Sequence, residues 1–201
     1  MISAALLALI ASAQSEASAS LYFPLNPGDK YVFEEEYNKM KKLFTDVVGQ
    51  PKDMKGRLSY PVETFLGASQ SLGKVYYHAE KDRILVTGTD FSDALASPYP
   101  IFVASKGTQT FSWAGEVPVP HGLPEPLSII GSSKPGKTAQ LFGKKRTTVE
   151  VTLDMDLMGL KTVQKSVYAE GIGLISMTEE SGKKKVKRTR VLKSYEPAGG
   201  L

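Results

Sequence analysis

The sequence contains no cysteine and only two histidines. Without cysteine, this chain can form no disulfide, thiolate metal site or cysteine nucleophile, and it carries no lipid-modified N-terminal cysteine. His78 stands in an apolar, strand-like stretch and His121 in a proline-rich one, so their placement fits no metal-ligand spacing. We therefore predict no metal site and no cofactor, and a fold that is stabilised by packing alone.

Long apolar runs are also missing, because no stretch approaches the roughly 20 apolar residues of a transmembrane helix. The N-terminal run, residues 2–11, is too short to cross a bilayer, and we predict no transmembrane span. This run is followed by Ala-Ser-Ala at residues 11–13 and again at residues 17–19, as in a secretory signal peptide.

We therefore predict that residues 1–19 are a signal peptide, cleaved before Gln14 or before Ser20. The mature protein would then be periplasmic or extracellular. The alternative is an Ala- and Ser-rich tail, because no Lys or Arg precedes the apolar run.

Neither basic nor acidic residues are in large excess over the other. Lys and Arg number 25 against 21 Asp and Glu, for a net charge of +4. This balance is far from the basic density of a dedicated nucleic-acid binder, and we predict no nucleic-acid partner. The hydrophobic content of 41% and charged content of 23% are those of a globular domain. We predict one domain, residues 20–196, followed by a short tail, residues 197–201.

Short stretches rich in β-branched and aromatic residues, bounded by turn formers, recur along the chain and indicate strands. They are residues 30–37, 57–66, 74–79, 84–87, 108–113, 147–153, 161–169, 172–177 and 185–195. We predict a mostly β fold, with an antiparallel sheet that curves into a half-barrel or forms a sandwich.

One or two short helices complete this prediction. Tyr37, Met40, Phe44 and Val47 have helical spacing, which predicts a helix over residues 37–48, although a strand over residues 43–48 fits as well. Residues 91–96 are the second helix candidate.

Two regions of the chain show similar patterns. FPLNPGDKYVFE at residues 23–34 and FVASKGTQTFSW at residues 102–113 each combine an apolar entry, a glycine turn and an aromatic strand. YHAEKDRILV at residues 77–86 aligns without a gap on VYAEGIGLIS at residues 167–176. We interpret these matches as two degenerate halves, residues 21–90 and 99–196. The alternative is chance similarity between amphipathic hairpins.

Two of these blocks carry a family resemblance. The opening Tyr-Phe-Pro-Leu-x-x-Gly-Asp-Lys-Tyr-x-Phe (residues 22–33) and the closing Tyr-Ala-x-Gly-Ile-Gly-Leu-Ile (residues 168–175) resemble blocks of uncharacterised exported bacterial proteins. The match covers most of the mature chain in outline, with Tyr31 where tryptophan is more usual. The resemblance implies an antiparallel sheet wrapping toward a half-barrel, similar to lipoprotein-carrier folds, and neither an activity nor site residues.

The stretch GSSKPGKT, residues 131–138, matches the phosphate-loop pattern G-x-x-x-x-G-K-[ST]. A phosphate loop needs free backbone N–H groups and a long following helix. Pro135 has no N–H, and residues 139–142 lead into Gly143 and a basic turn instead of a helix. We therefore interpret the match as chance and the stretch as an exposed loop; a nucleotide binder is a remote alternative.

An envelope hydrolase with an atypical carboxylate site is the main functional alternative. Glu150, Asp154 and Asp156 would share one side of a continuous strand and could bind calcium or act as acid and base. Gly159 and its neighbours favour a solvated loop over residues 155–160 instead. We therefore assign no catalytic residues.

The run KKKVKRTR contains six basic residues in a short span. They are Lys183, Lys184, Lys185, Lys187, Arg188 and Arg190. A polyanion site would use such a patch, whereas a solvated edge strand with lysines that block edge-to-edge pairing is the simpler interpretation. Glu179 and Glu180, across the turn at Ser181-Gly182, would neutralise part of it.

A proline-rich loop is the first candidate for a contact surface. VPVPHGLPEP, residues 117–126, follows the single tryptophan of the chain and predicts an extended, irregular loop. The candidate ligand or partner contacts are Trp113, Val117, Pro118, His121 and Leu123. We expect an exported, non-enzymatic β-domain that binds an apolar ligand in a sheet concavity or a cell-envelope partner, such as a lipid, on its surface.

Overall fold

The structure is a computed structural model, and it describes residues 18–67, 69–90, 94–104, 106–119, 122–182 and 186–199. In these residues the chain is mostly β, which confirms the predicted fold class. The single short helix among them is α1 (Ala19–Tyr22). The strands are β1 (Lys30–Tyr37), β2 (Met40–Val48), β3 (Lys52–Asp53), β4 (Leu58–Leu66), β5 (Gln70–Ala79), β6 (Arg83–Thr89), β7 (Tyr99–Val103), β8 (Gln109–Val117), β9 (Glu125–Pro135), β10 (Ala139–Leu141), β11 (Lys144–Arg146), β12 (Thr148–Leu157), β13 (Leu160–Ala169), β14 (Gly173–Ser181) and β15 (Val186–Glu196).

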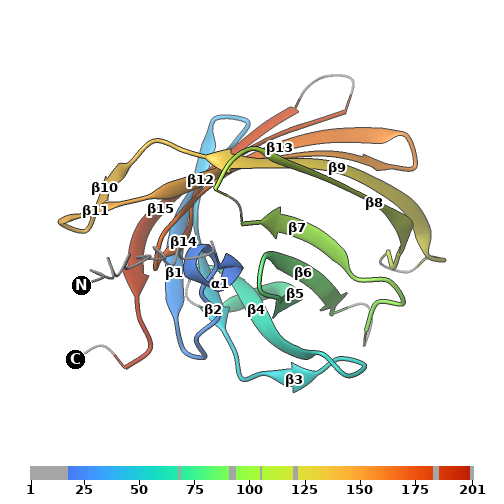
Figure 1. Ribbon diagram of the computed structural model, residues 1–201, viewed down its shortest axis with the longest axis horizontal. Coiled ribbons are helices and arrows are strands. Elements are labelled where there is room, and N and C mark those ends of the chain that lie inside the picture. Colours follow the sequence, from blue (N-terminus) through green and yellow to red (C-terminus); the bar gives the residue numbers. More distant parts are fainter. Residues whose placement is uncertain are drawn as a thin grey trace, which may run out of the picture.

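The main sheet is antiparallel and strongly curved (Figure 1). Its strands follow the order β7-β6-β5-β4-β2-β1-β15-β14-β13-β12-β9-β8, with β3 paired to β4. In Figure 1 the layer containing β8, β9, β12 and β13 lies above the layer containing β4, β5 and β6, and β1, β2 and β15 join the two on the left. The last strands of the path, β7 and β8, contact each other, so the sheet closes almost completely around its interior.

The predicted helix over residues 37–48 is wrong, because this segment is the turn and second strand of a hairpin. Tyr37 of β1 pairs with Met40 of β2, and Asn38 and Lys39 between them have positive φ angles of 50° and 65°. Positive φ at both central residues is the type I′ turn that matches the twist of a two-residue hairpin. The turn lacks the glycine that usually marks it, while Phe44 and Val47 happen to have helical spacing.

The described residues include only part of the second helix candidate, residues 91–96. Residues 91–93 lie outside the described residues, and residues 94–96 are not helical. Leu95 of this segment is buried, and its N–H donates to the Thr87 carbonyl at 2.8 Å, so the segment packs beside β6.

The strand order shows two runs of paired strands, but the first run includes β7 (Tyr99–Val103), which the predicted division assigned to the second half. In the order of the chain, β1 begins one run of paired strands (β1, β2, β4, β5, β6, β7) and β8 begins another (β8, β9, β12, β13, β14, β15). The aligned hairpins β5–β6 and β13–β14 occupy corresponding places, and each carries a bulge, beside Tyr77 and Tyr168 respectively. Duplication itself stays a prediction.

The core lies between the two layers of the curved sheet. Its buried side chains come from both layers, with Ile84 in β6 and Phe102 in β7 packed near Ile129 in β9 and Val151 in β12. Full burial of such a side chain contributes about 1.5–3 kcal/mol to folding. A smaller cluster of Tyr31, Phe33 and Val48 lies where β1 and β2 join the layers. These clusters leave part of the interior unfilled.

Candidate functional site

The interior contains a cavity of about 300 Å³, here called the inner cavity. It is lined by strands of both layers and by the segment before β1. The lining residues are Phe23, Pro24, Leu25, Tyr31, Phe33, Asp46, Val48, Val62, Val75, Tyr77, Val86, Tyr99, Ile101, Leu153, Met155, Gln164, Tyr168, Gly173, Leu174, Met177 and Arg190. Most of these residues are aliphatic or aromatic, and the volume of the cavity is at the lower end of the range for small-molecule sites.

Alternation along each strand places these side chains inside. On β2, for example, Asp46 and Val48 line the cavity while Val47 between them points the other way. The sequence shows this alternation, but it does not show which face of each strand is concave. Sequence reasoning therefore missed the cavity-lining residues as a site, although it anticipated a concavity in the sheet.

The N-terminal segment closes one end of the inner cavity. The N–H of Ala19 in α1 donates to the Lys81 carbonyl at 3.0 Å, and the Leu21 carbonyl accepts from the Gly171 N–H at 2.7 Å. These bonds fix the segment across both layers, and the Phe23 ring packs between Tyr77 and Tyr168 at 5.1 and 5.8 Å between ring centroids. Figure 1 shows α1 in front of the gap between the layers.

The charged groups of the lining form an ion pair. Nη2 of Arg190 in β15 donates to Oδ1 of Asp46 in β2 at 2.9 Å, and each side chain is 13% exposed. The Thr64 hydroxyl donates to the same Asp46 oxygen at 2.8 Å, and the Arg190 guanidinium lies 4.2 Å from the centroid of the Phe33 ring. The pair is thus held in place by hydrogen bonding and by a cation–π contact.

Tyrosine hydroxyls supply further polar atoms in the lining. Burial raises the pKa of Tyr77 and of Tyr99, and raises the pKa of Tyr168 to about 12. Each raised pKa reflects the cost of moving a phenolate out of water. These hydroxyls are therefore neutral at physiological pH, so the cavity presents apolar surface with one compensated ion pair.

A second recess, the outer groove, has a volume of about 610 Å³ and lies at the end of the sheet formed by the β1–β2 and β14–β15 connections. Its lining mixes apolar and charged side chains. The lining residues are Glu35, Tyr37, Met40, Lys42, Phe44, Leu160, Glu179, Ser181, Gly182, Val186 and Arg188. Arg188 pairs with Glu179 at 2.9 Å and with Glu35 at 3.9 Å.

The residues predicted around the proline-rich loop are dispersed in the structure. Trp113 in β8 packs on Tyr99 of β7 at 5.4 Å, and its Nε1 donates to Ser97 Oγ at 3.2 Å. It therefore ties the two end strands of the sheet together. Val117 is buried, Pro118 is half-buried and Leu123 is 82% exposed, while His121 lies outside the described residues. A contact role for this set stays a prediction.

The predicted basic patch does not lie on an edge strand. β15 pairs with β1 on one side and β14 on the other, so the edge-strand interpretation is wrong. The cause is the return of the chain end to β1, which local sequence does not reveal. Lys183, Lys184 and Lys185 lie outside the described residues.

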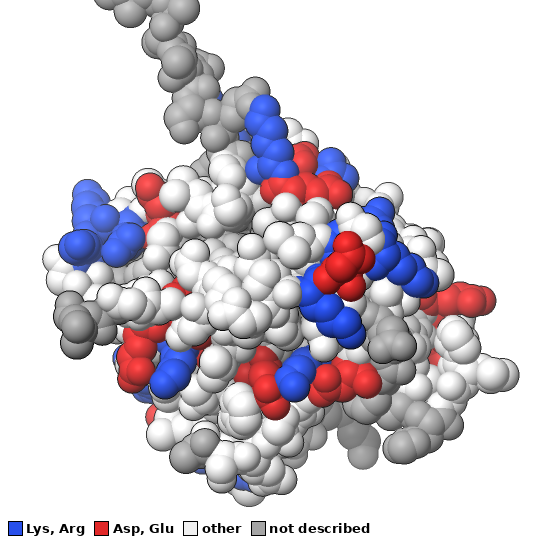
Figure 2. Space-filling model, turned by 90° about the horizontal axis from the view of Figure 1, so that it is seen from below, with Lys and Arg blue, Asp and Glu red and all other residues white. Residues whose placement is uncertain are grey.

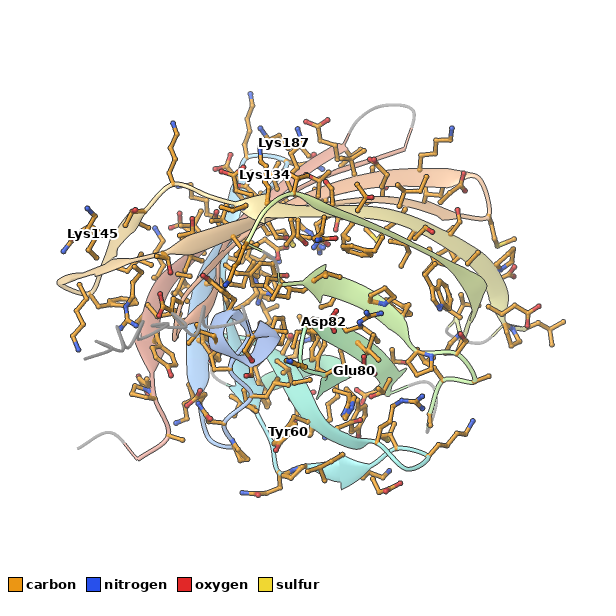
Figure 3. The ribbon with its side chains drawn as sticks, in the orientation of Figure 1. Tyr60, Glu80, Asp82, Lys134, Lys145 and Lys187 are labelled. Carbon is orange, nitrogen blue, oxygen red and sulfur yellow. The ribbon has the colours of Figure 1, made fainter. Side chains whose placement is uncertain are left out.

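The described members of the patch lie on both faces of β15. Lys187 lies at the outer surface (Figure 3), whereas Arg188 lines the outer groove and Arg190 the inner cavity. Glu179 forms an ion pair with Arg188, so the expected neutralisation is confirmed for this arginine, and Glu180 lies opposite Lys187 in the strand register. Figure 2, which views the molecule from below, shows basic and acidic side chains interleaved around an uncharged centre on that face.

The phosphate-loop match lies in a β-sheet. Residues 131–135 are the end of β9, which is antiparallel to both β8 and β12, so the predicted loop is wrong for this part. Strand β10 follows at Ala139, without an intervening helix. A Cβ on Gly131 would collide with the Phe111 ring, and one on Gly136 with Thr148, so both glycines of the pattern have packing reasons.

The candidate carboxylates occupy a longer strand than predicted. β12 continues through Leu157, and Met158 and Gly159 alone form the turn, so a loop over residues 155–160 is wrong. Glu150 pairs with Lys134 at 3.2 Å, and Asp156 accepts the Gly159 N–H at 2.7 Å.

The fold does not bring together the metal-binding candidates among the described residues. Within the described part of the chain, the structure contains no cluster of three or more acidic or histidine side chains suited to a metal ion. Nδ1 of His78 lies 2.8 Å from the Leu58 carbonyl oxygen, a contact that fixes the ring beside β4.

Also within the described part, no helix has the length and hydropathy of a membrane span.

Comparisons with known proteins show similarity in fold. No protein-family model matches the chain, and no curated protein is similar to it in sequence. A protein of Bacteroides fragilis, described as exported and with a YmcC-like fold, aligns with a TM-score of 0.45 and 11% identity over 90% of this chain and 100% of that one. A protein of Parabacteroides distasonis, described as a lipoprotein, aligns with a TM-score of 0.46 and 11% identity over 91% and 100%. Both similarities concern the overall fold alone.

Proposed function

We propose that this protein is an exported, non-enzymatic β-domain that binds an apolar ligand in its inner cavity. The observation that carries the proposal is the apolar lining of a recess of about 300 Å³ between the two layers of the sheet. A folded core normally packs without such voids, because unfilled space forfeits dispersion contacts. A ligand with an apolar chain would restore those contacts and remove its own apolar surface from water.

The chemistry of the lining favours binding over catalysis. Asp46 is the carboxylate of the described lining, and it is already paired with Arg190 and Thr64. The described lining offers no histidine or serine beside it that could serve as a base or nucleophile. The hydrolase alternative therefore has no comparable support.

Export is the second part of the proposal. It is supported by the apolar run at residues 2–11, which precedes two Ala-Ser-Ala sites. Outside the cytoplasm, a protein with an apolar cavity can hold a lipid-like molecule away from water.

The test is titration of the protein with N-phenyl-1-naphthylamine, an apolar dye whose fluorescence rises in an apolar site. We expect saturable fluorescence that dodecanol displaces. Val62→Trp, which places a large side chain in the inner cavity, should weaken dye binding by at least about tenfold, or 1.4 kcal/mol.

The matched control is Val191→Trp, at an exposed position of β15 beside the inward-facing Arg190. It adds the same side chain outside the cavity, and we expect dye affinity to stay within about twofold of the wild type. Equal weakening by both variants, or non-saturable binding to the wild type, would contradict a site in the cavity. Melting temperatures of the variants verify that each is folded.

A further inference from the structure

We propose that the ligand is a single-chain amphiphile with an anionic headgroup, and that Arg190 binds this headgroup while the chain fills the inner cavity. This inference rests on the proposed function and adds a ligand class and an orientation to it. Its basis is the place of Arg190 between the inner cavity and the outer groove.

The two recesses share one concave face of the sheet. On β15, Arg190 lines the inner cavity and Arg188 the outer groove, and residues two positions apart on a strand lie on the same face. On β2, Asp46 lines the inner cavity and Phe44, two positions away, lines the outer groove. On β1, Phe33 lines the inner cavity and Glu35, also two positions away, lines the outer groove. The outer groove and the inner cavity therefore follow one another along the same face of these strands.

Arg190 lies at the junction of the recesses. Its guanidinium carbon is 4.2 Å from the centroid of Phe33, which lines the inner cavity, and 5.9 Å from that of Phe44, which lines the outer groove. A molecule that extends from one recess to the other would pass this guanidinium.

The Arg190 guanidinium has more N–H donors than its hydrogen bond to Asp46 uses. A guanidinium carries five N–H donors in a planar fork, and Nη2 is the donor to Asp46. Nε of Arg190 is buried and has no hydrogen-bond partner among the residues that the structure describes, and the same holds for Nε of Arg188. A buried donor without a partner destabilises the fold, so a small shift of the guanidinium that brings a ligand oxygen to this N–H would be favoured. Carboxylates and phosphates match the fork geometry best.

The closed end of the cavity sets the direction of the ligand. Phe23 and α1 cover the end opposite the outer groove, so a chain would enter tail first from the groove and leave its headgroup at Arg190. Exposed apolar side chains at the groove, among them Met40 and Leu160, offer the chain a path from the surface. Asp46 keeps the arginine oriented, and it also limits the net attraction for an anion.

The test compares dodecanoate with dodecanol, each displacing N-phenyl-1-naphthylamine at about pH 8, where the carboxylate is ionised. The variant is Arg190→Gln combined with Asp46→Asn, which removes both charges and leaves neither partner buried alone. We expect the dissociation constant of dodecanoate to rise at least about tenfold and that of dodecanol to change by less than about twofold.

Two outcomes would overturn the proposal: an unchanged dissociation constant for dodecanoate, or equal changes for both ligands. If neither ligand displaces the dye from the wild type, the proposed function itself fails. Should the double variant not fold, Arg190→Lys provides the same comparison. It retains the charge beside Asp46 but has no Nε–H and no planar fork, so dodecanoate alone should again bind more weakly.

Discussion

The Tyr195 hydroxyl donates a hydrogen bond of 3.2 Å to Oδ2 of Asp29, a residue 166 positions away in the sequence. Asp29 is 1% exposed and also accepts from the Tyr31 hydroxyl, the Asn26 side-chain amide and the Ala198 N–H. These bonds join the turn before β1 to the end of β15, so the predicted tail after residue 196 is in part fixed to the domain. Because β1 and β15 are neighbours in the sheet, these hydrogen bonds of Asp29 stabilise the pairing between the start of β1 and the end of β15.

Asp29→Asn should therefore destabilise the protein by about 2–4 kcal/mol. The NH₂ group of the new amide would point at N–H and O–H groups that now donate to the carboxylate, and donor would oppose donor. Tyr195→Phe removes one hydrogen bond and keeps the ring on Tyr31 at 4.9 Å, and it should cost about 1 kcal/mol. Urea denaturation measures both changes.

Asp53→Asn is the control for this pair, because the exposed Asp53 carboxylate accepts a single backbone N–H, from Gly56, which an amide oxygen can also accept. We expect a change below about 0.5 kcal/mol. Similar losses for Asp29→Asn and Asp53→Asn would show that Asp29 has no special role.

Alkaline pH should destabilise the fold through its buried tyrosines. The folded-state pKa of Tyr168 is raised to about 12, above the ordinary tyrosine value. The stabilising contribution of the neutral hydroxyl is complete below about pH 10 and is lost as the pH rises from about 10 to 12. In this window Tyr168→Phe should make the fall in unfolding free energy shallower by about 1.4 kcal/mol per pH unit. Parallel curves for wild type and variant would contradict this prediction.

We expect that the segment matching the phosphate-loop pattern, residues 131–138, binds no nucleotide in solution. Lys137 is exposed, and the atom of this residue that accepts a bond from Thr148 Oγ1 is its backbone carbonyl oxygen, which alanine keeps. Lys137→Ala should thus change stability by less than about 0.5 kcal/mol. Millimolar ATP or GTP with magnesium should leave the melting temperature of the wild type unchanged, whereas a ligand at about 100 times its dissociation constant would add about 2.7 kcal/mol. An upward shift that Lys137→Ala abolishes would restore the nucleotide hypothesis.

If residues before the domain are a signal peptide, the burial of Ala19 favours one of the two predicted cleavage sites. Ala19 is fully buried, and its N–H donates to the Lys81 carbonyl. Cleavage before Ser20 would remove this residue and place a charged amino group against the core, at a high desolvation cost. We therefore expect the mature protein to begin at Gln14. Intact-mass spectrometry of exported material measures this, and a mature chain that starts at Ser20 would contradict it.

Local sequence pattern was sufficient to predict most strands, since alternation and turn residues act over short distances. Its errors came from features with weak local signals. The Asn38-Lys39 turn lacks glycine, so a hairpin resembled a helix. The same limit made β15 resemble an edge strand, because its pairing with β1 joins segments far apart in sequence.

The candidate site was harder to predict than the fold. The Arg190–Asp46 pair joins residues 144 positions apart, and the sequence shows Arg190 only as one member of a basic run. A concavity for an apolar ligand could be expected from a curving sheet, but its lining depends on how the two layers pack. Trp113, the single tryptophan of the chain, was a predicted ligand or partner contact, and the structure places it at the junction of β7 and β8.

The most direct test of the central claim is a crystal structure of the protein grown with an ω-brominated fatty alcohol, with the bromine located by anomalous scattering. We predict a bromine peak inside the inner cavity, toward Phe23, with the chain passing between Val62 and Leu153. Bromine found only on the outer surface, or an inner cavity filled by the protein's own side chains, would contradict the account.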